Sequence, residues 1–118
     1  MIYGGDNMSL KNTPAIIIKR GNTTTITITV PESIDLTSVK HVYLTFVQDT
    51  KKIRKVDNEL IIAEHEVSYK MTQAETLSYS IESPISIQLN WTYFDGSRGQ
   101  TKIVKIRVDD TLEPEVLD

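Results

Sequence analysis

The sequence predicts an all-β protein that folds as a single antiparallel sandwich of about seven or eight strands. Over most of the chain apolar and polar residues alternate, and a period of two is the pattern of a strand with one buried and one solvated face. Short groups of turn-forming residues separate these runs, as they do in sandwiches and barrels. Strands with one apolar face must pack in two layers, so we expect two sheets to enclose the core.

Two strands open the expected domain. Residues 15–19, AIIIK, are mostly apolar, and Arg20-Gly21-Asn22 turns the chain after them. In residues 23–30 threonine alternates with isoleucine, and Pro31 ends the run. β-branched residues lose side-chain freedom in a helix, so residues 23–30 are predicted to form a strand.

The middle of the chain repeats this pattern. Residues 41–47, HVYLTFV, alternate strictly, and residues 51–56, KKIRKV, follow as a basic strand. Asp57-Asn58 separates that strand from residues 59–64, ELIIAE, and the alternation returns in residues 66–71, EVSYKM. These runs predict four further strands.

One short helical turn is expected near residues 72–78. Thr72 and Glu75 have the spacing of a capping box, in which each side chain accepts a hydrogen bond from the backbone of the other. Ala74 and Leu77 tolerate a helix, but the stretch is too short for more than one turn crossing between sheets.

The last strands flank a hairpin turn. Residues 84–94, PISIQLNWTYF, and residues 102–108, KIVKIRV, alternate, and Asp95-Gly96 supplies the positive φ that a tight turn needs. An open immunoglobulin-like sandwich is the simplest arrangement for this set of strands. The residues expected in its core are Ile26, Ile28, Leu44, Phe46, Ile87, Leu89, Trp91, Val104 and Ile106.

Three segments are expected along the chain. Residues 1–12 are polar and are expected to be flexible, and residues 13–108 form the β-sandwich domain. Residues 109–118, DDTLEPEVLD, contain five acidic residues and no basic one. This tail is either a disordered extension or an arm that docks on a neighbouring subunit through its apolar residues, which are Leu112, Val116 and Leu117.

Composition excludes several classes of protein. The 118 residues suffice for one core, and the chain contains no cysteine, so it has neither disulfides nor thiolate metal sites. A net charge of −3 argues against a nucleic-acid-binding protein, which needs a positive field to displace counterions. No apolar run is long enough to span a bilayer, and the first residues lack the pattern of a signal peptide, so we expect neither membrane insertion nor secretion.

No group of residues has the pattern of a catalytic, cofactor or metal site. The carboxylates are scattered over turns, solvent faces and the tail, whereas acid–base catalysis needs a pair held across a pocket. His41 is expected to face outward, and His65 has no second histidine nearby for a zinc site. Phosphate-loop, dinucleotide and nucleophile-elbow motifs are absent from the sequence. We therefore expect no enzyme activity, no cofactor, no metal and no small-molecule ligand.

Two basic features are candidates for interaction. KKIRK contributes Lys51, Lys52, Arg54 and Lys55, which form either a polyanion patch or an edge strand kept from aggregating by its charges. A third possibility is a docking surface for an acidic segment of another protein, such as the tail of a sister subunit. Arg98 lies in a turn, where it either reaches a carboxylate or phosphate or is simply solvated.

Trp91 has two interpretations. A tryptophan in a carbohydrate-binding platform would lie on a polar, exposed face. Trp91 instead shares its face with Leu89 and Tyr93, which favours burial in the core.

Several motifs resemble those of small tail- or baseplate-associated structural proteins of phages and prophages of Gram-positive bacteria. Those proteins share an R/K-G-x-T opening after a short strand, a T-Q-x-E-T-L-x-F/Y crossover, a V-Q-x-x-W-x-x-x-D-G hairpin and an I-x-V-x-x-x-L close before an acidic tail. The resemblance covers residues 12–117, and one departure is Asn90, where an apolar or basic residue is more usual. The matching residues are Lys19, Gly21, Thr23, Thr72, Gln73, Glu75, Thr76, Leu77, Gln88, Trp91, Asp95, Gly96, Ile106, Val108 and Leu112.

The resemblance implies a non-enzymatic virion component, made in the bacterial cytoplasm, with an immunoglobulin-like fold. Its implied partners are other phage structural proteins, with self-association as a further possibility. A carbohydrate-binding or adhesive sandwich of the cell surface is the alternative function.

Overall fold

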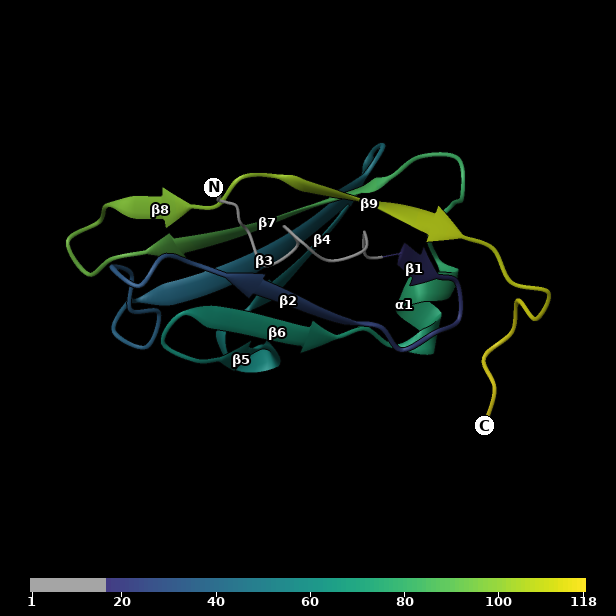
Figure 1. Cartoon of the computed structure of the whole chain (residues 1–118), viewed down its shortest axis with the longest axis horizontal. Helices are drawn as coiled ribbons and strands as arrows, with labels where there is room; N and C mark the ends of the chain where they lie inside the picture. Colours follow the sequence, from purple (N-terminus) through teal and green to yellow (C-terminus); the bar gives the residue numbers. More distant parts are fainter. Residues whose placement is uncertain (1–16) are drawn as a thin grey trace.

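The computed structural model of the chain describes residues 17–118 as an antiparallel sandwich of two sheets, which confirms the predicted fold class. The segment expected to be flexible, residues 1–12, lies outside the described residues. In Figure 1 the smaller sheet lies below the strands β7, β8 and β9 of the larger one. The larger sheet contains β1 (Ile17–Lys19), β3 (His41–Gln48), β4 (Lys51–Val56), β7 (Ile85–Thr92), β8 (Arg98–Gln100) and β9 (Val104–Asp109). The smaller sheet contains β2 (Thr25–Thr29), β5 (Ile61–Ile62) and β6 (Glu66–Lys70).

Strand order makes the sandwich immunoglobulin-like. The smaller sheet runs β2-β6-β5, and the larger runs β1-β9-β7-β3-β4 with β8 also paired to β7. Every pairing is antiparallel except that of β1 with β9. β4 lies at an edge of the larger sheet, where its basic residues oppose edge-to-edge association with other chains.

The inner faces of the two sheets form the core. Strict alternation in β3 and β7 places every second side chain in it, as Leu44 opposite Leu89 and Phe46 opposite Ile87 illustrate. Of the residues expected there, Val104 is partly buried and packs against the cluster. The others are fully enclosed and are Ile26, Ile28, Leu44, Phe46, Ile87, Leu89, Trp91 and Ile106.

A helix of one turn, α1 (Gln73–Leu77), crosses between the sheets where the sequence predicts it. Its first turn is closed by the capping box: Thr72 Oγ1 accepts from the Glu75 N–H at 3.1 Å, and Glu75 Oε1 accepts from the Thr72 N–H at 2.8 Å. The buried Thr76 then ties α1 to the turn after β1. Its hydroxyl accepts from the Gly21 N–H at 2.9 Å and donates to the Asn22 carbonyl at 2.9 Å.

β8 and β9 together take the place of one long strand. β8 pairs with the end of β7 and β9 with its beginning, and residues 101–103 between them leave the regular ladder. Thr101 keeps the interruption attached to β7, because its N–H donates to the Leu89 carbonyl at 2.9 Å. Because β8 is a separate strand, the described chain has nine strands where seven or eight were expected.

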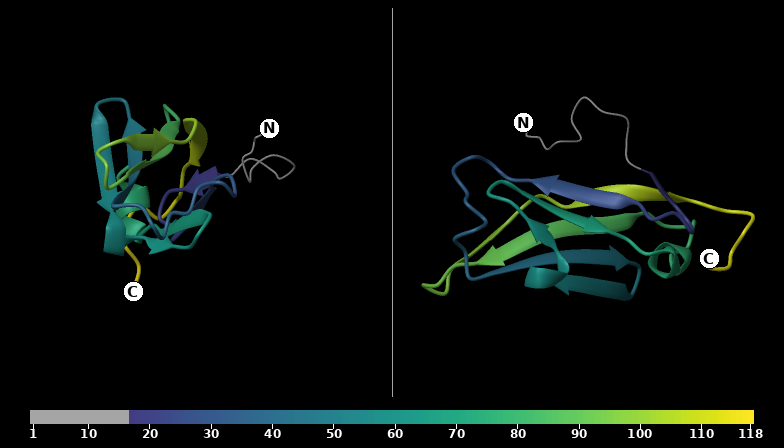
Figure 2. Two further views of the ribbon diagram at one scale, coloured as in Figure 1. Left: turned by 90° about the vertical axis from the view of Figure 1, so that its left-hand side faces the viewer. Right: turned by 90° about the horizontal axis from the view of Figure 1, so that it is seen from below.

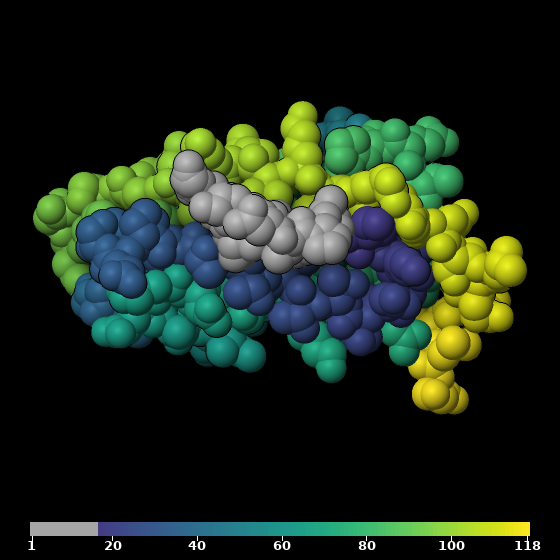
Figure 3. Space-filling model, viewed as in Figure 1, coloured from purple at the N-terminus to yellow at the C-terminus, as the bar shows by residue number. Residues whose placement is uncertain are grey.

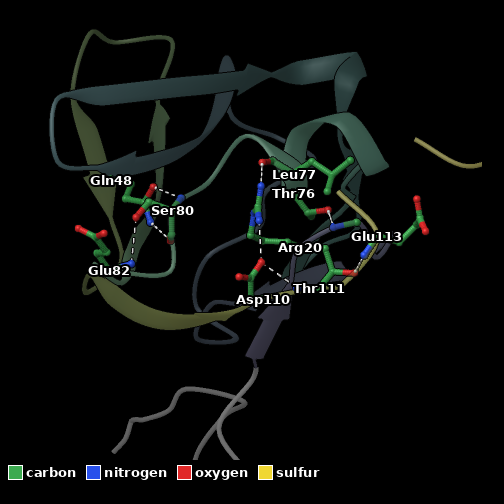
Figure 4. A network of polar contacts seen from close by, with 10 residues as sticks. Arg20, Gln48, Thr76, Leu77, Ser80, Glu82, Asp110, Thr111 and Glu113 are labelled. Atoms are coloured by element: carbon green, nitrogen blue, oxygen red, sulfur yellow. Dashed lines mark hydrogen bonds and ion pairs between the residues drawn. The ribbon is translucent and has the colours of Figure 1, made fainter. Parts of the chain in front are cut away.

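One buried amide was not expected. Gln48, at the end of β3, is 5 % exposed and binds the loop that precedes β7. Its Nε2 donates to the carbonyls of Ser80 and Ser83 at 2.7 and 2.8 Å, and its Oε1 accepts from the Ser80 N–H at 2.9 Å. These bonds, partly visible in Figure 4, fix a segment that has no secondary structure of its own.

Candidate functional site

A groove of about 650 Å³ lies on the outer face of the larger sheet. Its walls are formed mainly by the side chains that alternate with the core residues of β3, β4 and β7, so the same period of two that builds the core also builds the groove. The lining consists of Tyr43, Thr45, Val47, Lys52, Arg54, Ser86, Ile87, Gln88, Asn90, Trp91, Thr92, Arg98 and Ile103.

The charge of this groove is opposite to that of the whole protein. Among the described residues that line it, Lys52, Arg54 and Arg98 are cationic and none is a carboxylate, whereas the net charge of the chain is −3. A concave surface with charge of one sign concentrates the field and attracts counter-charged groups. The groove is therefore suited to an anionic ligand.

Neighbouring side chains hold the two arginines in place. The Arg54 guanidinium lies 5.4 Å from the centroid of the Tyr43 ring, in a cation–π contact. Arg98 Nη2 donates to Asn90 Oδ1 at 2.8 Å. A guanidinium has five N–H donors, so each arginine keeps donors for a carboxylate of a bound partner.

The groove also offers polar and apolar contacts. Gln88 Nε2 donates to the Thr101 carbonyl at 2.8 Å, which ties the floor of the groove to the interruption between β8 and β9. At that interruption Ile103 lines the groove and keeps 60 % of its surface exposed. An exposed apolar side chain beside fixed cations suits a segment that carries both acidic and apolar residues.

The structure does not bring the four basic residues of KKIRK together. Lys52 and Arg54 face the groove, but Lys51 and Lys55 lie on the opposite face of β4, against α1. Lys51 Nζ donates to the Ser78 carbonyl at 3.0 Å and lies 4.1 Å from the centroid of the Tyr79 ring. Alternation along β4 separates charges that are adjacent in sequence.

Lys55 belongs to a cluster that secures α1. Its Nζ lies 2.9 Å from Glu75 Oε2, and the Tyr69 hydroxyl donates to the same carboxylate at 2.7 Å. Burial raises the pKa of Glu75, but hydrogen bonds from Thr72, Tyr69 and Lys55 outweigh it, so the net pKa is below its ordinary value. The bond to Glu75 raises the pKa of Lys55. Lys51 and Lys55 therefore hold α1 on the sheet, away from the groove.

The other predicted interaction residues lie in a C-terminal arch, defined as residues 110–118. Arg20 fixes its start: Nη1 donates to Asp110 Oδ1 at 2.6 Å and Nη2 to the Leu77 carbonyl at 3.1 Å (Figure 4). Gln73 fixes its end: Nε2 donates to the Leu117 carbonyl at 2.9 Å, and Oε1 accepts from the Leu117 N–H at 2.8 Å. The arch projects at one end of the molecule in Figure 3 and exposes Leu112, Val116 and Leu117.

Both histidines make structural contacts. His41 Nδ1 lies 2.6 Å from Asp57 Oδ2, and Asp57 Oδ1 accepts from the Val42 N–H at 2.8 Å. His65 Nδ1 lies 2.8 Å from the Ile34 carbonyl oxygen. Within residues 17–118, no group of three histidine or carboxylate side chains is placed to hold a metal ion. In the same range no helix is long and apolar enough to cross a bilayer.

Trp91 borders the groove but is buried. Its side chain is 4 % exposed, and its Nε1 donates to the Tyr93 hydroxyl at 3.0 Å. The groove residues that the sequence did not indicate as interaction residues include Tyr43, Gln88, Asn90 and Ile103. In the sequence these residues are marked only by their polar character or by their outward position in an alternating run. That they lie beside one another in the groove follows only from the register of the paired strands.

A scan against protein-family models, a search of curated proteins and a search of solved structures find no match for the chain.

Proposed function

We propose that the protein is a non-enzymatic structural component of a phage or prophage virion, in its tail or baseplate, that assembles by binding an anionic segment of another protein. The observation that carries the binding mode is the groove on the outer face of β3, β4, β7 and β8, whose described charged residues are Lys52, Arg54 and Arg98. The virion assignment rests on the resemblance of the sequence motifs. The partners are other structural proteins of the particle, and the site of action is the virion.

A protein segment suits the groove better than a nucleic acid. Binding to phosphates requires a broad positive surface, and the chain is acidic overall. A short acidic peptide needs only a few fixed guanidinium groups, which bind carboxylates with two parallel hydrogen bonds. Ile103 adds an apolar contact that a polyphosphate would not use.

Carbohydrate binding remains the alternative, with less support. Sugar platforms use exposed aromatic rings, but Trp91 is buried and the Tyr43 ring is covered by Arg54. Phe94 is exposed, yet it is not among the residues that line the groove.

The test is recovery of the protein in particles. The prophage of a strain that encodes the chain is induced, particles are purified on a density gradient, and the protein is quantified against the major capsid protein. We expect it at a fixed ratio in intact particles. Its absence from particles that are produced in normal yield would contradict the proposal.

Charge reversal tests the groove in the same assay. Arg54→Glu with Arg98→Glu should leave the fold intact and strongly reduce incorporation. Lys19→Glu with Lys40→Glu is the matched control, because both of these residues are exposed, lie outside the groove and change the net charge equally. Equal incorporation of the two double variants would contradict docking through the groove.

A further inference from the structure

We propose that the segment that occupies the groove is the C-terminal arch of a second copy of this chain. The inference rests on the proposed function, because it names the anionic protein segment that the groove binds. It predicts that copies associate head to tail.

Charge complementarity supports this occupant. Asp110 is already paired with Arg20, but the arch also carries Glu113, Glu115 and Asp118, all exposed. Those carboxylates match the cations of the groove, which has no carboxylate of its own among its described lining residues. Guanidinium–carboxylate pairs with fixed geometry give orientation as well as attraction.

The apolar contacts match as well. Leu112 is 103 % exposed, so no atom of the described chain covers its side chain. Ile103 lines the groove and is 60 % exposed. Seating Leu112 against Ile103 would remove both from water and place the acidic residues of the arch beside Arg54 and Arg98.

Hydrogen bonds anchor both ends of the arch. Arg20 holds its beginning and Gln73 its end, which leaves residues 111–116 as a projecting span between two fixed points. A segment held in this way loses little conformational entropy on docking. An anchored span of this kind is better suited to a specific contact than a free tail would be.

A second copy is required because the arch is remote from its own groove. Its anchors, Arg20 and Gln73, are not among the residues that line the groove. Figure 1 and the right-hand view in Figure 2 place the arch beside α1, at the end opposite the β7–β8 turn. Each copy then offers one arch and one groove, and such a heterologous contact closes into a ring or continues as a filament.

Cysteine cross-linking tests the contact in the full-length chain, which has no cysteine of its own. A Leu112→Cys variant is mixed under mild oxidation with an Ile103→Cys variant that carries an affinity tag. The matched control replaces Ile103→Cys by Ile61→Cys, since Ile61 is 74 % exposed and lies in the smaller sheet. All these positions are exposed, and thermal melting is used to check that each variant is folded.

We expect the Leu112–Ile103 pair to cross-link at least about tenfold faster than the control pair, because docking raises the effective concentration of the thiols. The rate should fall at high salt, and it should fall to the control value when Arg54→Glu and Arg98→Glu accompany Ile103→Cys. Equal rates for the two pairs, or no effect of charge reversal, would overturn the inference. If cross-linking fails but the charge-reversed protein is still lost from particles, the groove binds a different protein, and only the identity of the occupant is refuted.

Discussion

Gly99 of β8 lies directly against the indole of Trp91 on β7. The two residues are partners in the ladder, and a Cβ atom at position 99 would lie 2.4 Å from Trp91 Cε2. No side chain fits there without displacing the ring. The indole of Trp91 therefore packs over the backbone of β8 at a position that only glycine can occupy without a shift of the ring.

Gly99→Ala should destabilise the protein by about 1–3 kcal/mol, because the added methyl group forces the indole out of its packing position. Urea unfolding followed by the fluorescence of Trp91, the only tryptophan, measures both effects. The emission maximum of the folded variant should move to longer wavelength. Gly96→Asn is the control, because position 96 has open space and asparagine tolerates its positive φ. Equal midpoints for the two variants would contradict this view of Gly99.

The hydroxyl of Thr76 should matter more than its methyl group. Thr76→Val keeps the shape but leaves the Gly21 N–H and the Asn22 carbonyl without their partner, at a cost of about 2–4 kcal/mol. Thr76→Ser keeps the hydroxyl and loses one buried methyl group, at a cost of about 1 kcal/mol. Chemical unfolding at neutral pH measures both. A valine variant as stable as the serine variant would show that these bonds contribute little.

Glu75 should make stability depend on pH in the acid range. Its folded-state pKa is below the ordinary 4.5, so its contribution is present above that pH and is lost as the pH falls through the folded-state pKa. Glu75→Gln should cost about 1–3 kcal/mol at pH 7, because the bonds from Lys55, Tyr69 and Thr72 lose their charged acceptor. The difference between wild type and variant should shrink as unfolding is repeated toward pH 3. A difference that is independent of pH would contradict this assignment.

Gln73 should order the C-terminal arch without stabilising the core. Gln73→Ala removes both hydrogen bonds to Leu117, so amide exchange in residues 111–118 should accelerate while the unfolding midpoint changes little. Gln73→Glu retains an acceptor for the Leu117 N–H and should have an intermediate effect. Hydrogen–deuterium exchange with mass spectrometry measures the exchange rates of residues 111–118 in the wild type and in the two variants. Unchanged exchange in the alanine variant would show that Gln73 does not anchor the arch.

The elements that the sequence predicts well are those determined by neighbouring residues. Alternation in residues 41–47 and 84–94 identifies β3 and β7, and Thr72 with Glu75 locates α1, because a strand face and a capping box each depend on local spacing. The class of fold follows from the need to bury those faces together.

The groove could not be predicted in the same way, because it depends on register. Thr45 meets Arg54 on one side and Gln88 on the other only after β3 pairs with both β4 and β7. The contact between Arg20 and Asp110 joins residues 90 positions apart, which no local pattern indicates.

The most direct test of docking between the C-terminal arch and the groove is a titration of the isotope-labelled, full-length protein with a synthetic peptide of residues 109–118, monitored by nuclear magnetic resonance. We predict saturable, salt-sensitive shifts at the amides of β7 and β8 that border the groove, such as Asn90 and Arg98, and none in the smaller sheet. The same titration of the Arg54→Glu and Arg98→Glu double variant should show no shifts. Shifts that are absent from the groove, or that persist unchanged in the double variant, would contradict docking of the C-terminal arch in the groove.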